Sequence, residues 1–411
     1  MMEYIPLTKI YYQNFDQYET IYQSRFNSAY THHIDFQIGD YPAFFTITPE
    51  VQNLALSIYK TDKQISMICN ILPPIALQQF SKRCLIDEIV LTNNIEGVHS
   101  TRREIDDILS DLEVKSKKDR FRGLVAKYVM LQKSADIPLD TCTDLRHIYN
   151  DLVLDEVISA DPNNAPDGLI FRKGAVSVTS PSQKEIHRGL YPEPKIIDAM
   201  GKALAFLNDD TIDMLYRTSL FHYLFGYIHP FYDGNGRTNR FISSYLLTKE
   251  LDPLLSFRLS YTIKQNINDY YESFKICNDN HSRGDLTPFL IFFLGIIKKS
   301  IDQLYNGLSE RCRQLDHYGS SIHYLPHGDN PQYRSLYYYL VQAELFSEHG
   351  ISTPELLYHM KLSRDTLRKL LKTIPQQLLK VAEIKHTKYY GIDLPIYDAY
   401  IQSAASSAEP N

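Results

Sequence analysis

The spacing of apolar and polar residues predicts a mainly helical protein. Apolar residues recur three and four positions apart along most of the chain, which is the period of an amphipathic helix. Pro73 and Pro74 separate two such segments, because proline ends one helix readily and begins the next. The predicted helices cover residues 48–70, 73–93, 101–112, 119–134, 142–157, 194–207, 210–228, 237–250, 263–281 and 286–317.

Three segments depart from this helical pattern. Residues 169–178 follow a turn-rich cluster and alternate well enough to predict short strands. Residues 1–47 are rich in Tyr and Gln and show little periodicity, so we expect an irregular N-terminal arm. Residues 401–411 are small and polar, and we expect a disordered tail there.

A change of pattern near residues 318–331 predicts a linker, and the chain beyond it has a different organisation. Three helices and then two short strands are predicted, a succession that resembles a winged-helix domain over residues 332–400. These elements cover Tyr333–Phe346, Thr353–His359, Leu362–Leu371, Val381–Lys385 and Lys388–Ile392.

The third of these helices carries Arg364, Arg368 and Lys369. Such residues suit a recognition helix, because Arg and Lys contact guanine edges or phosphates in DNA. A solvated helix face is the commoner meaning of such charges, and winged helices also bind proteins. DNA and protein partners therefore both stay open at this stage.

Composition indicates an ordinary globular protein of two or three domains. The 411 residues are 44% hydrophobic and 22% charged. The net charge of −6 argues against a surface that coats nucleic acid as a whole, although one local basic patch stays compatible with it. The five cysteines are scattered, which predicts reduced thiols in a cytoplasmic protein and no zinc site. We expect no secretory signal and no membrane span.

The most informative segment is residues 229–240, which read His-Pro-Phe-Tyr-Asp-Gly-Asn-Gly-Arg-Thr-Asn-Arg. An apolar helical run ends at its start, and a new helix is expected to begin within it. Gly234 and Gly236 lack Cβ and can take positive φ, so backbone N–H groups can converge on one point. The N-terminus of the new helix adds free N–H donors and a positive dipole end. These features predict an anion cradle, most simply one for phosphate.

The side chains of the same segment suit phosphate chemistry. Arg237 and Arg240 are three residues apart and lie on one helix face, from which both can fork onto phosphate oxygens. Asp233 supplies oxygen ligands suited to Mg²⁺ that bridges a diphosphate. His229 is the one side chain here that can accept a proton near neutral pH.

The segment resembles the Fic signature, His-x-Phe-x-Asp/Glu-Gly-Asn-Gly-Arg-x-x-Arg, and matches it at every fixed position. The resemblance implies a mainly α fold with a Fic-type helical core and a small β-hairpin flap, here over residues 48–317. It also implies a protein adenylyltransferase, which moves AMP from Mg²⁺-ATP to a protein hydroxyl. Residues 171–178 resemble the flap, the strand pair that holds the target segment in such proteins.

The resemblance assigns a role to most residues of the signature. His229 would take the proton from a target Ser, Thr or Tyr hydroxyl. Asp233 would hold Mg²⁺ on the α- and β-phosphates. The anion hole would be formed by Gly234, Asn235 and Gly236.

The remaining assignments concern the arginines and the aromatic residues. Arg237 would contact the phosphates, and Arg240 would hold the γ-phosphate. Phe231 would point into the core and anchor the loop. Tyr271 or its neighbour Tyr270 would border the adenine, an assignment that rests on position alone.

A second motif lies upstream, where Thr92-Asn93-Asn94-Ile95-Glu96-Gly97 resembles the Fic inhibitory motif, with Thr92 in place of the commoner Ser. It would end an inhibitory helix over about residues 76–97. The resemblance implies that Glu96 pairs with Arg240 and takes the place of the γ-phosphate. ATP would then bind in a pose that is misaligned for attack.

Other functions stay open. The same residues could remove AMP from a modified protein, with Glu96 orienting a water molecule, or the chain could be a nucleotide-sensing regulator that acts through its winged helix. Transfer of phosphocholine, phosphate or UMP is less favoured, because the phosphate-transferring branch carries a lysine at the position of Gly236. The sequence leaves open the target, which could be the chain itself, and whether the chain forms a homodimer.

Overall fold

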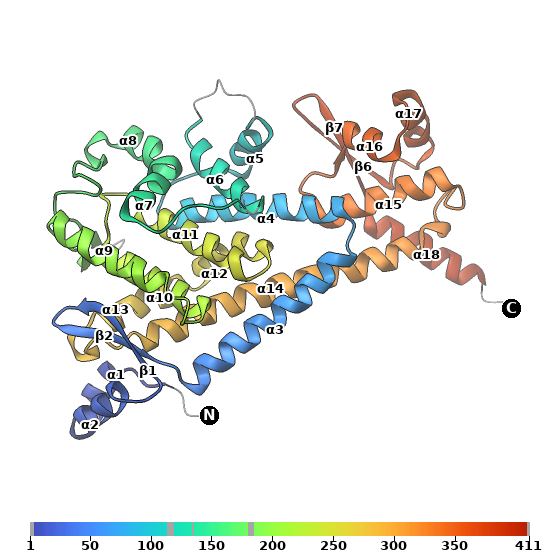
Figure 1. Cartoon of the computed structure of the whole chain (residues 1–411). Coiled ribbons are helices and arrows are strands. Elements are labelled where there is room, and N and C mark those ends of the chain that lie inside the picture. Colours follow the sequence, from blue (N-terminus) through green and yellow to red (C-terminus); the bar gives the residue numbers. More distant parts are fainter. Residues whose placement is uncertain (1–3, 113–118, 134, 180–184, 409–411) are drawn as a thin grey trace. The chain divides into compact units, whose positions relative to one another are not determined.

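The computed structural model describes residues 4–112, 119–133, 135–179 and 185–408 (Figure 1). Contacts group the chain into two units, one of residues 1–63 and 85–304 and one of residues 64–84 and 305–411. Helices α3 (Pro49–Ile71), α4 (Pro74–Ile95) and α14 (Thr287–Ser320) therefore contribute residues to both units. The domain limits predicted at 48–317 and 332–400 stay predictions.

The centre of the first unit is α10 (Met214–Ile228), which packs against α9 (Glu193–Leu207) and α11 (Asn235–Glu250). Its apolar side chains point in all directions and are buried, as expected of a helix enclosed by others. Residues 229–234 form the short loop between α10 and α11, so the signature segment lies in the middle of this helical core.

Further helices surround this centre, and two of the predicted helices are interrupted. The predicted helix 142–157 contains a π-helical turn. The predicted helix 263–281 is interrupted at Asn266, whose backbone N–H and side-chain amide both donate to the Thr262 carbonyl, at 3.2 and 2.8 Å. The elements are α5 (Arg102–Ser110), α6 (Arg122–Gln132), α7 (Cys142–Tyr149), η1 (Asn150–Leu154), α8 (Asp155–Ala160), η2 (Pro162–Asn164), η3 (Pro253–Phe257), α12 (Leu259–Gln265), α13 (Ile267–Asn278) and η4 (Asn280–Ser282).

The expectation of an irregular N-terminal arm was wrong. The arm contains α1 (Leu7–Gln13), α2 (Phe15–Phe26) and an antiparallel hairpin of β1 (Thr31–Ile38) and β2 (Tyr41–Thr46). Buried tyrosines such as Tyr18 do much of the packing, and tyrosine gives a weak apolar signal in a sequence pattern.

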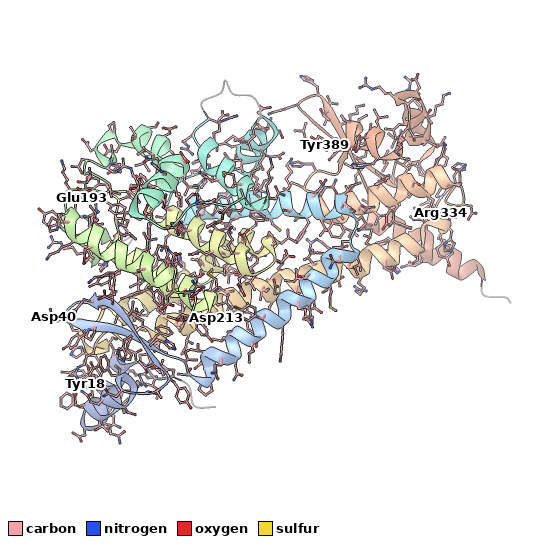
Figure 2. The ribbon with its side chains drawn as sticks, in the orientation of Figure 1. Tyr18, Asp40, Glu193, Asp213, Arg334 and Tyr389 are labelled. Carbon is pink, nitrogen blue, oxygen red and sulfur yellow. The ribbon has the colours of Figure 1, made fainter. Side chains whose placement is uncertain are left out.

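The flap prediction was correct only at its end. Strand β3 (Ser177–Thr179) pairs antiparallel with β4 (Glu185–Arg188), and residues 180–184 between them lie outside the described part of the chain. Residues 169–171 are not a strand, because their backbone N–H groups donate to the Glu193 carboxylate at 3.0, 2.8 and 2.9 Å. Figure 2 labels Glu193 at the start of α9.

The second unit contains the three helices and two strands predicted for the C-terminal region. Its three-stranded sheet has the order β5-β7-β6, with antiparallel pairs, and α15 packs on β7 and α16. Ser352 and Ser363 cap the second and third helices with their side chains. The elements are α15 (Pro331–Phe346), β5 (Ile351–Ser352), α16 (Thr353–Met360), α17 (Arg364–Thr373), β6 (Leu379–Ile384) and β7 (Thr387–Ile392). The name winged helix stays a prediction.

Two predictions about the edges of this unit were wrong. Helix α14 continues to Ser320, into the predicted linker, and a short turn η5 (Ile322–Tyr324) follows. The predicted tail 401–411 is helical as far as Ala408, in α18 (Leu394–Ala408), while residues 409–411 lie outside the described range. The helix is held near its start by Tyr397, whose buried hydroxyl donates to the Tyr318 carbonyl at 2.7 Å. No helix in the described ranges is long and apolar enough to cross a membrane.

Candidate active site

A cavity in the first unit lies where α10 ends and α11 begins. It is lined by seven residues that the sequence had singled out, together with His187 of β4 and further aromatic side chains of α10 and α13. These seven are Glu96, His229, Asn235, Gly236, Arg240, Tyr270 and Tyr271. Residues from four separate stretches of the chain therefore meet at one cavity.

His229 is held in place through its own backbone. It ends α10 in the left-handed conformation, with φ of 51°, and its N–H donates to the Phe225 carbonyl at 2.9 Å. Its carbonyl accepts from Nε and Nη2 of Arg172, at 3.0 and 2.8 Å. Arg172 is fully buried and also donates to the Leu190 carbonyl at 2.9 Å. The guanidinium therefore joins the base of the flap to the signature loop.

The environment of His229 favours its neutral form. Burial first, and then the nearby charges of His187 and Arg172, lower the pKa of the imidazole to about 3. A neutral imidazole keeps a free nitrogen lone pair that can accept a proton, but the low pKa makes His229 a weak base in the nucleotide-free chain. The negative charge of a bound triphosphate would raise this pKa.

The loop after His229 has one fixed conformation. Phe231 is buried and stacks on Tyr149 with ring centroids 3.7 Å apart, which confirms that it points into the core. The Asn235 amide accepts from the Phe231 N–H at 3.0 Å and donates to the Phe231 carbonyl at 2.8 Å. Gly234 has φ of 77°, the positive value that its lack of a side chain permits.

The start of α11 is open to the cavity, as the anion-cradle prediction requires. The first α11 N–H to bond within the helix belongs to Thr238, which donates to the Gly234 carbonyl at 3.0 Å. The N–H groups of residues 235–237 therefore lie at the positive end of the helix. The expectation of positive φ at Gly236 was wrong, because this residue is helical. Its lack of Cβ matters for another reason: a Cβ there would lie 2.2 Å from Glu96 Oε1.

Arg240 is held by three acceptors from residues 92–96. Its Nη2 lies 2.8 Å from Glu96 Oε1 and 2.9 Å from the Thr92 carbonyl, and its Nε donates to Thr92 Oγ1 at 2.8 Å. Arg240 is only 1% exposed. The predicted ion pair is therefore present, and the Glu96 carboxylate lies against both Arg240 and the first turn of α11.

Comparisons with known proteins agree with this geometry. Residues 141–247 match the model of the Fic/DOC family. The protein adenylyltransferase Fic of Drosophila yakuba is 34% identical over 108 residues, which make up 26% of this chain and 20% of that protein. The part of the chain that forms the cavity is therefore similar to the Fic/DOC family.

Two further comparisons find similar proteins. The protein adenylyltransferase Fic of Drosophila melanogaster is 33% identical over 108 residues, again 26% of this chain and 20% of that protein. A Fic family protein from Desulfovibrio desulfuricans G20 shares the fold, with a TM-score of 0.52 and 20% identity over 85% of this chain and 97% of that one. The chain spans about a fifth of the length of the curated Fic relatives it matches.

Four of the predicted site residues are not among those that line the cavity: Thr92, Asp233, Gly234 and Arg237. Asp233 lies on the loop, and its carboxylate accepts from the Gly234 N–H at 2.5 Å. The described residues contain no cluster of three or more His, Cys, Asp or Glu side chains suited to a metal. Mg²⁺ does not need such a cluster, because it is commonly bound by one carboxylate, substrate phosphates and water, so Asp233 fits this ion.

Arg237 differs most from its predicted role. Its Nη1 pairs with the Glu156 carboxylate of α8, and the side chain is 1% exposed. Its Nε and Nη2 are buried and have no hydrogen-bond partner among the described residues. Two unsatisfied donors on a buried cation fit a missing anionic acceptor, so contact with phosphate stays a prediction.

Several residues that shape the site were missed from the sequence. Arg172 and Glu156 act through partners far away in the chain, and no local pattern marks them. His187 of β4 lines the cavity, with its Nε2 2.6 Å from the Tyr227 carbonyl. Glu88 is buried and accepts from the Ser260 N–H, and burial raises its pKa to about 7. Glu88 was within reach of sequence reasoning, because it precedes Thr92 by one helical turn.

Proposed function

We propose that the chain is a protein adenylyltransferase that transfers AMP from Mg²⁺-ATP to a hydroxyl group of a protein. One observation carries the proposal: His229, the N-terminal turn of α11 and Arg240 line the same cavity. Such a cavity offers a base and two anion-binding groups to one substrate. The Drosophila relatives are named protein adenylyltransferase Fic, which supports the same reaction class.

In the proposed reaction the hydroxyl oxygen of the target attacks the α-phosphorus of ATP. A new P–O bond forms, the bond between the α-phosphorus and the bridging oxygen breaks, and pyrophosphate leaves. His229 accepts the hydroxyl proton on its free ring nitrogen. The N–H groups at the start of α11 stabilise negative charge on the phosphates, and this positioning supplies most of the catalysis in phosphoryl-type transfer.

Two groups would complete the binding of the nucleotide. Asp233 would hold Mg²⁺, which neutralises charge on the leaving pyrophosphate. Tyr271 is partly exposed and lines the cavity, so its ring would border the adenine. Tyr270 lines the cavity too, but its hydroxyl is bonded to His222 Nε2 at 2.7 Å, which gives it a structural task as well.

We further propose that Glu96 restrains this activity. Its carboxylate takes one donor of Arg240 and lies over the first turn of α11, which are the two places where a terminal phosphate would bind. ATP would then bind with its α-phosphorus away from the line of attack. A misplacement of about 1 Å can lower a rate by on the order of a hundredfold.

Intact-mass spectrometry tests both proposals. Glu96→Gly protein incubated with Mg²⁺-ATP is expected to gain the mass of AMP, by modification of itself or of an added target, and to gain more than the wild type. The Glu96→Gly/His229→Ala double variant is expected to gain none. Equal AMP uptake by the double variant would remove His229 from the reaction, and equal uptake by wild type and Glu96→Gly would remove the restraint.

A second reaction has one specific observation in its favour. Glu96 and His229 line the same cavity, so the carboxylate could orient a water molecule towards the phosphorus of an AMP-modified protein. The chain would then remove AMP instead of adding it. Incubation of the wild type with an AMP-modified protein distinguishes the two: release of AMP that Glu96→Gly abolishes supports removal, and unchanged modification excludes it.

A further inference from the structure

We propose that the second unit binds double-stranded DNA through α17 and the turn between β6 and β7. This binding goes beyond the proposed transfer of AMP and does not depend on it. It rests on three observations: the local charge, the geometry of α17 and the position of the β6–β7 turn.

Positive charge is concentrated in one segment of an acidic chain. Residues 361–388 contain eight Lys and Arg and only two Asp and Glu, while the whole chain has a net charge of −6. All eight basic side chains are exposed, and one of them, Lys380, pairs with Glu344 at 2.6 Å. Of the two acidic residues, Asp365 lies 3.6 Å from Arg368 at a solvent-exposed position, where such a pair contributes little. The segment is therefore a locally basic surface on a chain of negative net charge, which is the charge pattern that a phosphate backbone attracts.

Helix α17 presents one apolar and one basic face. Leu367 and Leu370 are buried, while Arg364, Arg368 and Lys372 follow one another at four-residue spacing on the exposed face. The ten residues span about 15 Å, a length that fits into the major groove of B-DNA.

The chain enters α17 through a tight turn. Lys361 ends α16 with φ of 53°, and Ser363 caps α17 by accepting from the Thr366 N–H at 3.2 Å. Two helices joined by such a short turn, with the second one basic, form the arrangement in which proteins place a helix in the major groove.

The β6–β7 turn adds a second basic element. Lys385 and His386 both have positive φ, 45° and 63°, as in the tight two-residue turns of β-hairpins. Lys388 follows on β7. Within this unit, Figure 1 shows the hairpin turn and α17 on the same side of α15. A duplex that receives α17 in its groove could therefore meet the turn at a neighbouring phosphate backbone.

Duplex DNA suits these features better than RNA does. An exposed helix with two arginines and one lysine on one face fits a groove about 12 Å wide. The major groove of an RNA duplex is too narrow and deep for side chains to read. An acidic protein would also attract the charges, and the experiment treats this as a contrary outcome.

The test is a titration of the full chain with a labelled, mixed-sequence DNA duplex of about 20 base pairs, roughly two helical turns. Fluorescence anisotropy is measured between about 50 and 200 mM KCl. The triple variant Arg364→Ala/Arg368→Ala/Lys369→Ala is compared with Lys60→Ala/Lys63→Ala/Lys264→Ala, which removes three exposed charges from the first unit. Circular dichroism checks that both variants stay folded.

The wild type and the control variant are expected to bind DNA alike. The α17 variant is expected to bind at least tenfold more weakly, and its salt slope is expected to fall by about 0.9 for each phosphate contact that is lost. Equal weakening in both triple variants, no binding by the wild type at the lowest salt, or tighter binding to an RNA duplex of the same sequence would each overturn the proposal. So would binding of poly-glutamate that the α17 variant loses while DNA binding is unchanged.

Discussion

The strongest prediction concerns the pair between Glu96 and Arg240. The Glu96→Ala substitution removes the carboxylate that lies 2.8 Å from Arg240 Nη2 and leaves the two Thr92 acceptors in place. Arg240 then stays oriented but has one charge-assisted donor available for the γ-phosphate. We expect faster transfer of AMP and little change in the fold.

The size of the effect follows from the ion pair between Glu96 and Arg240, which the γ-phosphate of ATP no longer has to displace. The side chains of Arg240 and Glu96 are 1% and 25% exposed, so solvent screens the pair only in part. A hydrogen bond to a charged group contributes about 1.5–3 kcal/mol. Because each 1.36 kcal/mol is a factor of ten, the rate of transfer at low ATP should rise between about tenfold and a hundredfold.

The assay measures incorporation of labelled AMP into the protein over time at limiting ATP. Glu310→Ala serves as the matched control, because it removes an exposed carboxylate of the second unit that pairs with Arg313 instead. A Glu96→Ala rate within a factor of two of both the wild type and the Glu310→Ala protein, about 0.4 kcal/mol, would refute the reasoning.

Three further predictions concern buried groups around the site. The pKa of Glu88 is raised to about 7 in the folded chain, so its stabilising contribution is complete below its ordinary pKa and is lost as the pH rises through 7. Glu88→Gln should therefore be more stable than the wild type by up to about 3 kcal/mol near pH 8 and equal to it near pH 4, as measured by urea unfolding; an offset that is the same at both pH values would contradict this. Arg172→Lys, introduced into the Glu96→Ala protein, should lower kcat at least about tenfold with little change in KM for ATP, because lysine cannot donate two hydrogen bonds to the His229 carbonyl. The control Arg188→Lys, on β4, should leave kcat unchanged. The His229 imidazole should stay neutral down to well below pH 5 in the nucleotide-free chain, since its pKa is about 3; an NMR titration, with His229→Ala to assign the resonance, would show a midpoint near 6.5 if burial had no effect.

Much of the site was predictable because its parts lie close together in the sequence. Residues 229–240 contain the proposed base, the glycines and both arginines, and local rules of helix ends and glycine conformation apply within such a segment. The pair of Glu96 and Arg240 came from the resemblance to a family motif, since 144 residues separate the two. Nothing in periodicity or spacing would have joined them.

The parts that were missed share a physical cause. Arg172, Glu156 and Glu193 each act through buried polar contacts with residues that are distant in sequence or in an irregular loop. Such contacts leave no periodic pattern. The N-terminal strand β1 was a different failure, because Ile34, Phe36 and Ile38 alternate with exposed residues and could have been recognised as a strand.

Arg172 also bears on how the proposed enzyme is controlled. Its guanidinium holds the carbonyl of His229 in the nucleotide-free chain, so the proposed base is positioned without a bound nucleotide. Binding of the nucleotide therefore carries no further entropy cost for positioning the proposed base. A chain built in this way is most easily switched at the substrate, by competing for the place of the nucleotide and not by dismantling the catalyst.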